Sequence, residues 1–110
     1  MKCISVPISA DAMKRLDFDE CVNGDLIEVL LSEEEYNSLW NTGVINKINS
    51  ALHINIDDYE DEELLGSTNL LQAKGIIESE LSSCMNEILE KLLLQVNKAI
   101  EYNTGVFFYF

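Results

Sequence analysis

The sequence predicts one α+β domain, residues 1–110, in which a small antiparallel sheet packs against a long C-terminal helix. Three observations support this fold class. Residues 2–9 are rich in β-branched and apolar side chains, apolar residues recur at helical spacing over residues 69–102, and the last five residues, VFFYF, are all strand formers. A length of 110 residues suits one domain with one core, and a hydrophobic content of 47% is that of an ordinary globular protein.

The first third of the chain predicts a strand, a short helix and a hairpin. Residues 2–9, KCISVPIS, form the strand, with Pro7 at an edge or at the strand's end because proline lacks the N–H that a ladder needs. Residues 10–16, ADAMKRL, form the short helix. Asn23-Gly24 is a hairpin signal, because both residues tolerate positive φ. It predicts a strand over residues 25–32, whose upstream partner strand would present the apolar side chains Leu16, Phe18 and Val22.

Residues 32–43, SEEEYNSLWNTG, predict a helix. Ser32 caps the first turn, and Glu35 stands three residues further on, which completes a capping box. The helix ends by Gly43. Its core-facing side chains, at helical spacing, are Tyr36, Leu39 and Trp40.

The segment over residues 44–68 carries mixed signals. Residues 44–52 have the apolar spacing of a helix, whereas Leu52, Ile54 and Ile56 alternate as in a strand. The acidic residues that follow, and the segment after them, are expected to form a loop or a short helix.

Residues 69–102 predict a long helix with an apolar stripe that covers about half of its circumference. Gly75 weakens its first turns, so a break at Gly75 is the alternative to one continuous helix. Asn103 and Gly105 supply the end of the helix. The VFFYF segment has no polar residue, so it needs cover on both sides and is expected to insert in the sheet as a strand.

The charge of the chain limits its partners. Twenty acidic and seven basic side chains give a formal net charge of −13. Such a chain repels the phosphates of nucleic acids and of anionic membrane surfaces. It attracts positively charged proteins and speeds their association. Solubility alone is the other explanation of this charge.

The cysteines predict a cytoplasmic protein. Cys3, Cys21 and Cys84 are odd in number and far apart, which is unlike a disulfide framework and suits a reducing compartment. The apolar stretch near the N-terminus is too short for the core of a signal peptide. No run of about 18 apolar residues is present, so no membrane span is expected.

The sequence predicts neither an enzyme nor a metal or cofactor site. Zinc sites need paired cysteine or histidine ligands, and the one histidine, His53, is expected to be an ordinary partly buried residue. A calcium loop that started at Asp57 would place Tyr59 and Thr68 where ligands are required. Neither a glycine-rich phosphate loop nor a nucleophile elbow is present.

The acidic run over residues 57–63, DDYEDEE, is the strongest candidate for a site. It has two interpretations, a solvated segment and a surface that binds a basic protein. In the second, the carboxylates pair with several Lys or Arg side chains, and a tyrosine at the centre acts as an anchor. Glu33 and Glu34 extend this predicted surface. Its central members are Asp57, Asp58, Tyr59, Glu60, Asp61, Glu62 and Glu63.

A small, acidic α+β chain without a catalytic motif resembles the immunity proteins of bacterial toxin–immunity systems. These include the immunity proteins of contact-dependent growth inhibition and the colicin and barstar-like inhibitors. The resemblance is one of type over the whole chain, and it rests on charge, length and the segments DDYEDEE and SEEEYNSLW. It implies an antitoxin that neutralises a basic toxin domain, often a nuclease, by tight association in the cytoplasm.

Two other classes of protein stay open. A type III secretion chaperone is also small, acidic and α+β, and it dimerises through a helix and binds an extended effector segment. A DNA mimic inhibits a nucleic-acid-binding protein, and it usually spaces its carboxylates along an elongated surface. The sequence leaves the oligomeric state undecided.

Overall fold

Four strands in the described part of the chain form one antiparallel sheet, in the order β2-β1-β4-β3. The structure is a computed structural model that describes residues 2–58 and 60–110. Tyr59, a member of the predicted binding surface, therefore lies outside the described residues. In chain order the elements are β1 (Lys2–Pro7), α1 (Ala10–Asp17), β2 (Leu26–Leu31), α2 (Glu33–Asn41), α3 (Val44–Leu52), β3 (Glu62–Leu65), α4 (Ser67–Ser83), α5 (Glu87–Tyr102) and β4 (Gly105–Tyr109).

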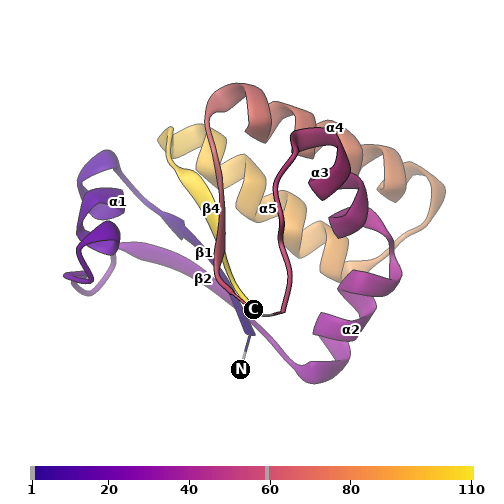
Figure 1. Ribbon diagram of the computed structural model, residues 1–110, viewed down its shortest axis with the longest axis horizontal. Helices are drawn as coiled ribbons and strands as arrows, with labels where there is room; N and C mark the ends of the chain where they lie inside the picture. Colours follow the sequence, from indigo (N-terminus) through magenta and orange to yellow (C-terminus); the bar gives the residue numbers. More distant parts are fainter. Residues whose placement is uncertain (1, 59) are drawn as a thin grey trace.

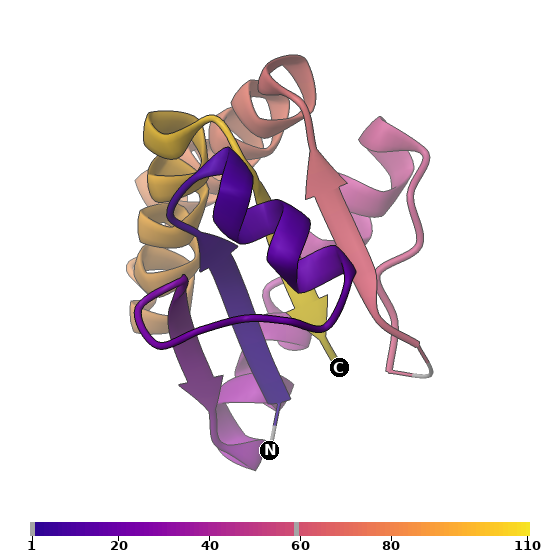
Figure 2. The same ribbon diagram turned by 90° about the vertical axis from the view of Figure 1, so that its left-hand side faces the viewer.

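The two faces of the sheet carry unequal amounts of helix. Figure 1 shows α2, α3, α4 and α5 on one side of the strands and α1 on the other. Figure 2, seen from the α1 side, shows α1 and the loop over residues 18–25 crossing in front of the strands. Among the described residues, α1, a helix of 8 residues, is thus the helix that covers this second face.

The core lies between the sheet and the larger helical layer. Side chains alternate across a strand, so every second residue of β1 and β4 points toward α5. These side chains, all at most 1% exposed, are Ile4, Val6, Val106 and Phe108. The predicted α+β class is confirmed, as are the C-terminal helix on the sheet and the VFFYF strand, which lies between β1 and β3. Pro7 is the last residue of β1, as expected.

The predicted hairpin around Asn23-Gly24 is wrong. The two residues form a turn with Gly24 at a φ of 88°, but residues 18–25 are a loop and β2 pairs with β1 instead. Phe18 and Val22, expected to face a partner strand, are 62% and 60% exposed. The polar residue Asp25 is buried in their place, and its bonds to α1 and to the loop hold this segment in a non-strand path.

The predicted helix over residues 69–102 is divided into α4 and α5, and the break falls at residues 84–86 instead of Gly75. Asn86 starts the second helix, because its Oδ1 accepts the N–H groups of Ile88 and Leu89 at 2.9 and 3.4 Å. The two helices pack against each other. Much of the broad apolar stripe is therefore buried within the chain.

The segment over residues 44–68 resolves into a helix, a loop and a short strand. Residues 44–52 form α3, as their spacing predicts. Residues 54–56 are not a strand, because the amide of Asn49 takes the place of a neighbouring strand: it accepts the N–H of Ile56 at 2.8 Å and donates to its carbonyl at 2.9 Å. β3 was not predicted, and it arises because Glu62–Leu65 pairs with the edge of β4.

Gln95 joins the long C-terminal helix to two strands. Its side chain is fully buried, and its Nε2 donates to the carbonyl oxygens of Ile4 and Ile27, both at 2.9 Å. These carbonyls belong to β1 and β2, so one amide fixes both strands against α5.

Replacing this amide tests its contribution to stability. The substitution Gln95→Met keeps the length of the side chain but leaves the buried carbonyl of Ile4 and the partly buried carbonyl of Ile27 without this donor, so the free energy of unfolding is expected to fall by about 1–3 kcal/mol. Urea unfolding followed by circular dichroism measures the change. The same substitution at the exposed Gln72 of α4 is the matched control, with an expected change below about 0.5 kcal/mol. Equal effects of the two variants would contradict this account of Gln95.

Candidate partner-binding surface

The acidic run lies at one edge of the sheet. Asp57, Asp58, Glu60 and Asp61 fall in the loop before β3, and Glu62 and Glu63 begin that strand, which lies beside β4. Two carboxylates order the loop: Asp57 Oδ2 accepts from Asn55 Nδ2 at 2.8 Å, and Glu62 Oε2 accepts the N–H of Asn55 at 3.3 Å. Amide groups of the chain thus hold the loop in a defined path.

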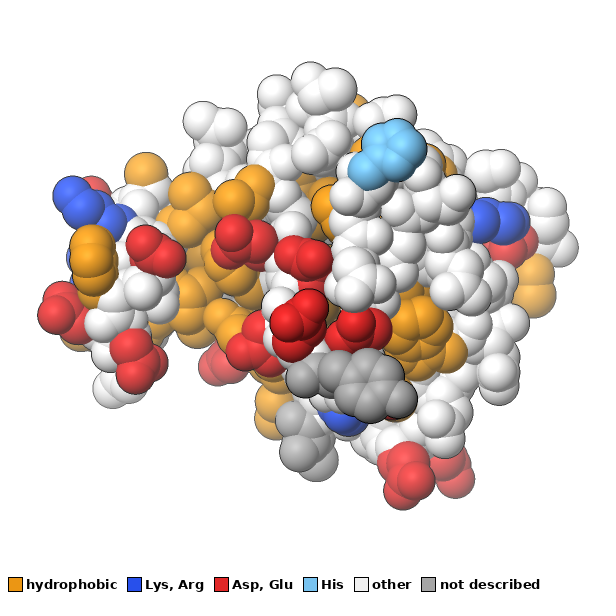
Figure 3. Space-filling view, viewed as in Figure 1, with side chains coloured by type: hydrophobic (Ala, Val, Ile, Leu, Met, Phe, Trp, Pro, Cys, Tyr) orange, Lys and Arg blue, Asp and Glu red, His pale blue; other side chains and the backbone are white. Residues whose placement is uncertain are grey.

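The other carboxylates of the run face solvent. Their residues are exposed, and within the part of the chain that the structure describes they form no ion pair; they are Asp58, Glu60, Asp61 and Glu63. The ion pairs of the described chain use other acids, namely Asp25, Glu35, Glu80 and Glu101. In Figure 3, acidic side chains gather between α1 and the centre of this view. These four exposed carboxylates therefore concentrate negative charge that no Lys or Arg of the described residues neutralises by an ion pair.

Asp57 and Asp58 face α2 across a hollow of about 530 Å³, here called the α2 hollow. Tyr36 and Trp40 line it, and Tyr36 packs edge-on against Phe110 at a centroid distance of 5.0 Å. Burial raises the pKa of Tyr36, and the charges of Asp58 and Asp57 raise it further. Its phenol therefore stays protonated at neutral pH.

The two glutamates of α2 lie around the same helix but in different hollows. Glu33 lines a hollow of about 500 Å³ with Lys2 and Tyr36, and Tyr36 also belongs to the α2 hollow. Glu33 thus continues the surface that Asp57 and Asp58 begin. Glu34 lines a different hollow, described below, on the side of α2 that faces the α4–α5 turn.

The second half of the run lines a groove on the less covered face of the sheet. Two hollows, of about 290 and 270 Å³, share Asp17, Glu63 and Phe107, and together they form the sheet-face groove. One wall is α1, and the other wall is β3. Strand register places Glu63 directly beside Phe107 of β4. Asp61 and Tyr109 complete the end of the groove that lies nearest the acidic loop.

Tyr109 lies where the apolar floor of the groove meets its acidic rim. Burial raises the pKa of its phenol to about 12, and the neighbouring carboxylates of Asp61 and Glu63 contribute to the rise. The apolar floor and the acidic rim therefore act on the same side chain. In Figure 3, hydrophobic side chains are visible between α1 and the acidic side chains at the centre.

An ion pair holds α1 in place as the wall of the groove. The guanidinium of Arg15 donates to both oxygens of Asp25, each at 2.7 Å, in a bidentate pair. Asp25 Oδ2 also accepts the N–H of Val22 at 3.0 Å, and its side chain is only 4% exposed. The Arg15 guanidinium lowers the pKa of Asp25 to about 2, and the Val22 N–H contributes. This pair ties α1 and the loop over residues 18–25 to the start of β2.

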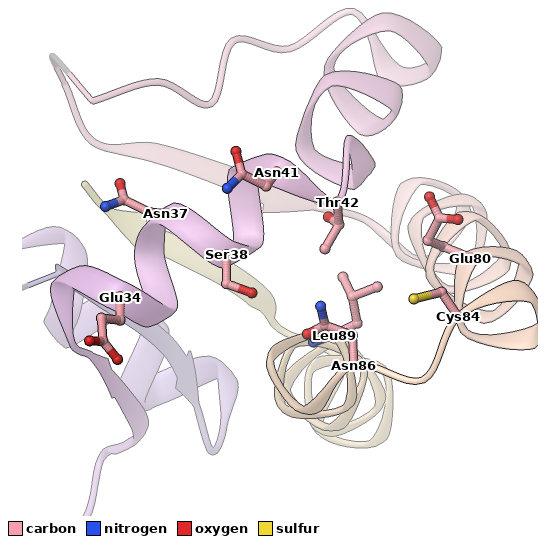
Figure 4. A pocket seen from close by; sticks show the side chains of 9 residues that line it. All are labelled: Glu34, Asn37, Ser38, Asn41, Thr42, Glu80, Cys84, Asn86 and Leu89. Atoms are coloured by element: carbon pink, nitrogen blue, oxygen red, sulfur yellow. Dashed lines mark hydrogen bonds between the residues drawn. The ribbon is translucent and has the colours of Figure 1, made fainter.

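A further hollow, of about 610 Å³, lies between α2 and the α4–α5 turn. Figure 4 shows that Glu34 lies at one end of it and that Glu80 and Cys84 lie at the other. Its lining is mainly amide and hydroxyl side chains, and no histidine is among the described residues that line it. A cysteine–histidine pair is therefore not formed here.

The described chain contains no arrangement suited to a metal ion. Over residues 2–58 and 60–110, no three His, Cys, Asp or Glu side chains are grouped so that they would hold one. His53 is exposed and ends α3 with a φ of 56°, so the prediction that it is partly buried is wrong. No helix in the same residues has the length and apolar character needed to cross a membrane.

Comparison with known proteins identifies no relative. No protein-family model matches the chain, and neither the curated proteins nor the solved structures give a significant match. Its function is therefore inferred from the surface described above.

The structure divides the predicted surface into two parts and adds residues to each. Asp57 and Asp58 face the aromatic side chains of α2, whereas Asp61 and Glu63 face the open side of the sheet. Asp17 was not predicted, since its position beside the run depends on α1 crossing the sheet. Side chains alternate between the two faces of a strand, so the VFFYF segment could have predicted that Phe107 and Tyr109 lie together on the face opposite to Phe108.

The Arg15–Asp25 pair predicts a specific loss of stability in acid. The pKa of Asp25 in the folded protein, about 2, lies below its ordinary value of 3.8, so the pair stabilises the fold above pH 4 and this contribution disappears as the pH falls toward 2. The melting temperature of the natural protein should therefore exceed that of Asp25→Asn at pH 5, and the difference should shrink toward pH 2.

Many carboxylates titrate in this range, so the comparison needs a control. The variant Glu78→Gln alters an exposed acid in the middle of α4, and the difference between its melting temperature and that of the natural protein should not shrink in this way. A constant difference between Asp25→Asn and the natural protein from pH 5 to pH 2 would contradict the assigned role.

Proposed function

We propose that this protein binds and neutralises a basic toxin domain, such as a nuclease, by protein–protein association in the cytoplasm, as an immunity protein does. It acts without catalysis and without a cofactor. Its contact surface is the acidic run, extended by Glu33 along α2 and by Asp17 across the sheet-face groove.

One observation carries the proposal. The exposed carboxylates of the run have no ion pair within the described chain, although the chain pairs acids elsewhere. Concentrated like charge destabilises a compact fold through repulsion. A basic partner relieves that repulsion on binding, and Arg side chains can engage the carboxylates bidentately.

Aromatic groups next to the charges support a protein partner. Tyr36 and Trp40 line the α2 hollow beside Asp57 and Asp58, and Tyr109 lines the groove beside Asp61. Tyrosine, tryptophan and arginine are the residue types that contribute most at protein interfaces. Nucleic acid is disfavoured on the same surface, because its phosphates would meet the carboxylates.

The packing of the helices gives less support to the alternative function, that of a type III secretion chaperone. Its main argument is the broad apolar stripe over residues 69–102. This stripe falls on α4 and α5, which pack against each other within one chain.

A protection assay tests the proposal with the product of the gene encoded directly upstream as the toxin. Cells that express this product should survive when the natural protein is co-expressed. A variant with Asp58→Asn, Glu60→Gln, Asp61→Asn and Glu63→Gln retains the loop contacts of Asp57 and Glu62, and it should bind at least about tenfold more weakly and protect poorly.

A second variant controls for charge. It combines Asp11→Asn, Glu78→Gln, Glu87→Gln and Glu90→Gln, all exposed and away from the run. Each variant removes four of the 13 net negative charges, which leaves −9. The control should protect as the natural protein does. Failure of the natural protein to bind and protect would refute the function, and equal loss in both variants would refute the assigned surface.

A further inference from the structure

We infer that the sheet-face groove receives an arginine side chain of the partner protein, with its guanidinium over Phe107 and Tyr109 and between the carboxylates of Asp17, Asp61 and Glu63. This inference rests on the proposed function and names the chemical group that the acidic surface recognises.

The size of the groove suits one side chain. Its two hollows measure about 290 and 270 Å³, which is at or below the lower limit of about 300 Å³ for pockets that enclose a small molecule. Figure 2 shows that α1 covers only part of this face of the sheet. A side chain that projects from a partner can therefore enter without any movement of the strands.

The floor of the groove is aromatic. Phe107 and Tyr109 are adjacent odd-numbered positions of β4, so both side chains lie on the α1 side of the sheet, and both are half-buried. Aromatic rings attract cations above their faces. A guanidinium also stacks on such rings because it is planar and weakly hydrated.

The carboxylates around the groove determine that the bound group carries a positive charge. The hollow nearer the acidic loop is lined by Asp17, Asp61, Glu62 and Glu63, and no Lys or Arg is among its described lining residues. Asp17 is the last residue of α1, where a negative charge opposes the helix dipole. A cation bound beside Asp17 would offset this unfavourable interaction with the helix dipole.

The cations of α1 do not fill this position. Arg15 is committed to Asp25 on the loop side of the helix. Lys14 lines the second hollow beside Asp17 and Glu63, but it forms no ion pair within the described residues and does not line the hollow that holds Asp61 and Tyr109. The end of the groove at Tyr109 is thus open to a cation from a partner.

Arginine fits this geometry better than lysine. The guanidinium presents five donors in a rigid plane, so it can reach carboxylates on both walls while it lies on the rings. The ammonium of lysine is compact and strongly hydrated, and it loses more hydration when it leaves water.

A peptide titration tests the inference independently of the toxin. The probe is the tripeptide acetyl-Gly-Arg-Gly-amide at low salt, followed by NMR of the ring protons of Phe107 and Tyr109. Saturable shifts of these protons are expected. The same peptide with citrulline, which keeps the shape without the charge, should give none, and the lysine peptide should bind at least about threefold more weakly.

Two variants of α1 distinguish binding in the groove from general electrostatic attraction between the cationic peptide and the acidic protein. Asp17→Asn should lower the affinity of the protein for the arginine peptide at least about fivefold. Asp11→Asn, with the same change of charge, should leave this affinity unchanged. Equal binding of the lysine peptide, equal effects of the two variants, or shifts spread evenly over the acidic surface would each overturn the inference. The proposed function would survive such a result if the upstream-encoded product still bound the natural protein.

Discussion

Strand β4 imposes the main constraint on this fold, because it is apolar on both faces and lies inside the sheet between β1 and β3. Val106 and Phe108 need a core on one side, and Phe107 and Tyr109 need cover on the other. The helices that follow β2 supply the core, whereas α1 alone, among the described helices, lies on the second face (Figures 1 and 2). The groove between α1 and β3 follows from this unequal cover.

The same arrangement explains why the acidic run is so exposed. β3 begins in the run and pairs with β4, which brings Glu63 beside Phe107 and directs the loop before it to the edge of the sheet. Asn55 ties Asp57 and Glu62 into this loop, and the remaining carboxylates point to solvent. The packing of β4 therefore stabilises the fold enough for it to tolerate the electrostatic repulsion among the carboxylates of the run.

The fold was largely predictable where one local signal dominated. The capping box at Ser32, the helical spacing of residues 44–52 and the apolar VFFYF segment each specified an element correctly. Long-range contacts decided the rest. The buried Asp25 overrode the hairpin signal, Asn86 divided the long helix, and pairing with β4 made a strand from charged residues. The acidic run was visible in the sequence, but Asp17, Phe107 and Tyr109 join it only through the packing of α1 across the sheet.

The central claim is that charge on this surface captures a basic protein, and the association rate measures it most directly. Stopped-flow mixing of the natural protein with the upstream-encoded product, at salt concentrations from about 25 to about 500 mM, gives the rate constant as a function of ionic strength. The account predicts that this constant falls at least about tenfold over the range, and that neutralising Asp58, Glu60, Asp61 and Glu63 removes most of the dependence. A rate constant that changes less than about twofold, or a salt dependence that survives neutralisation, would contradict it.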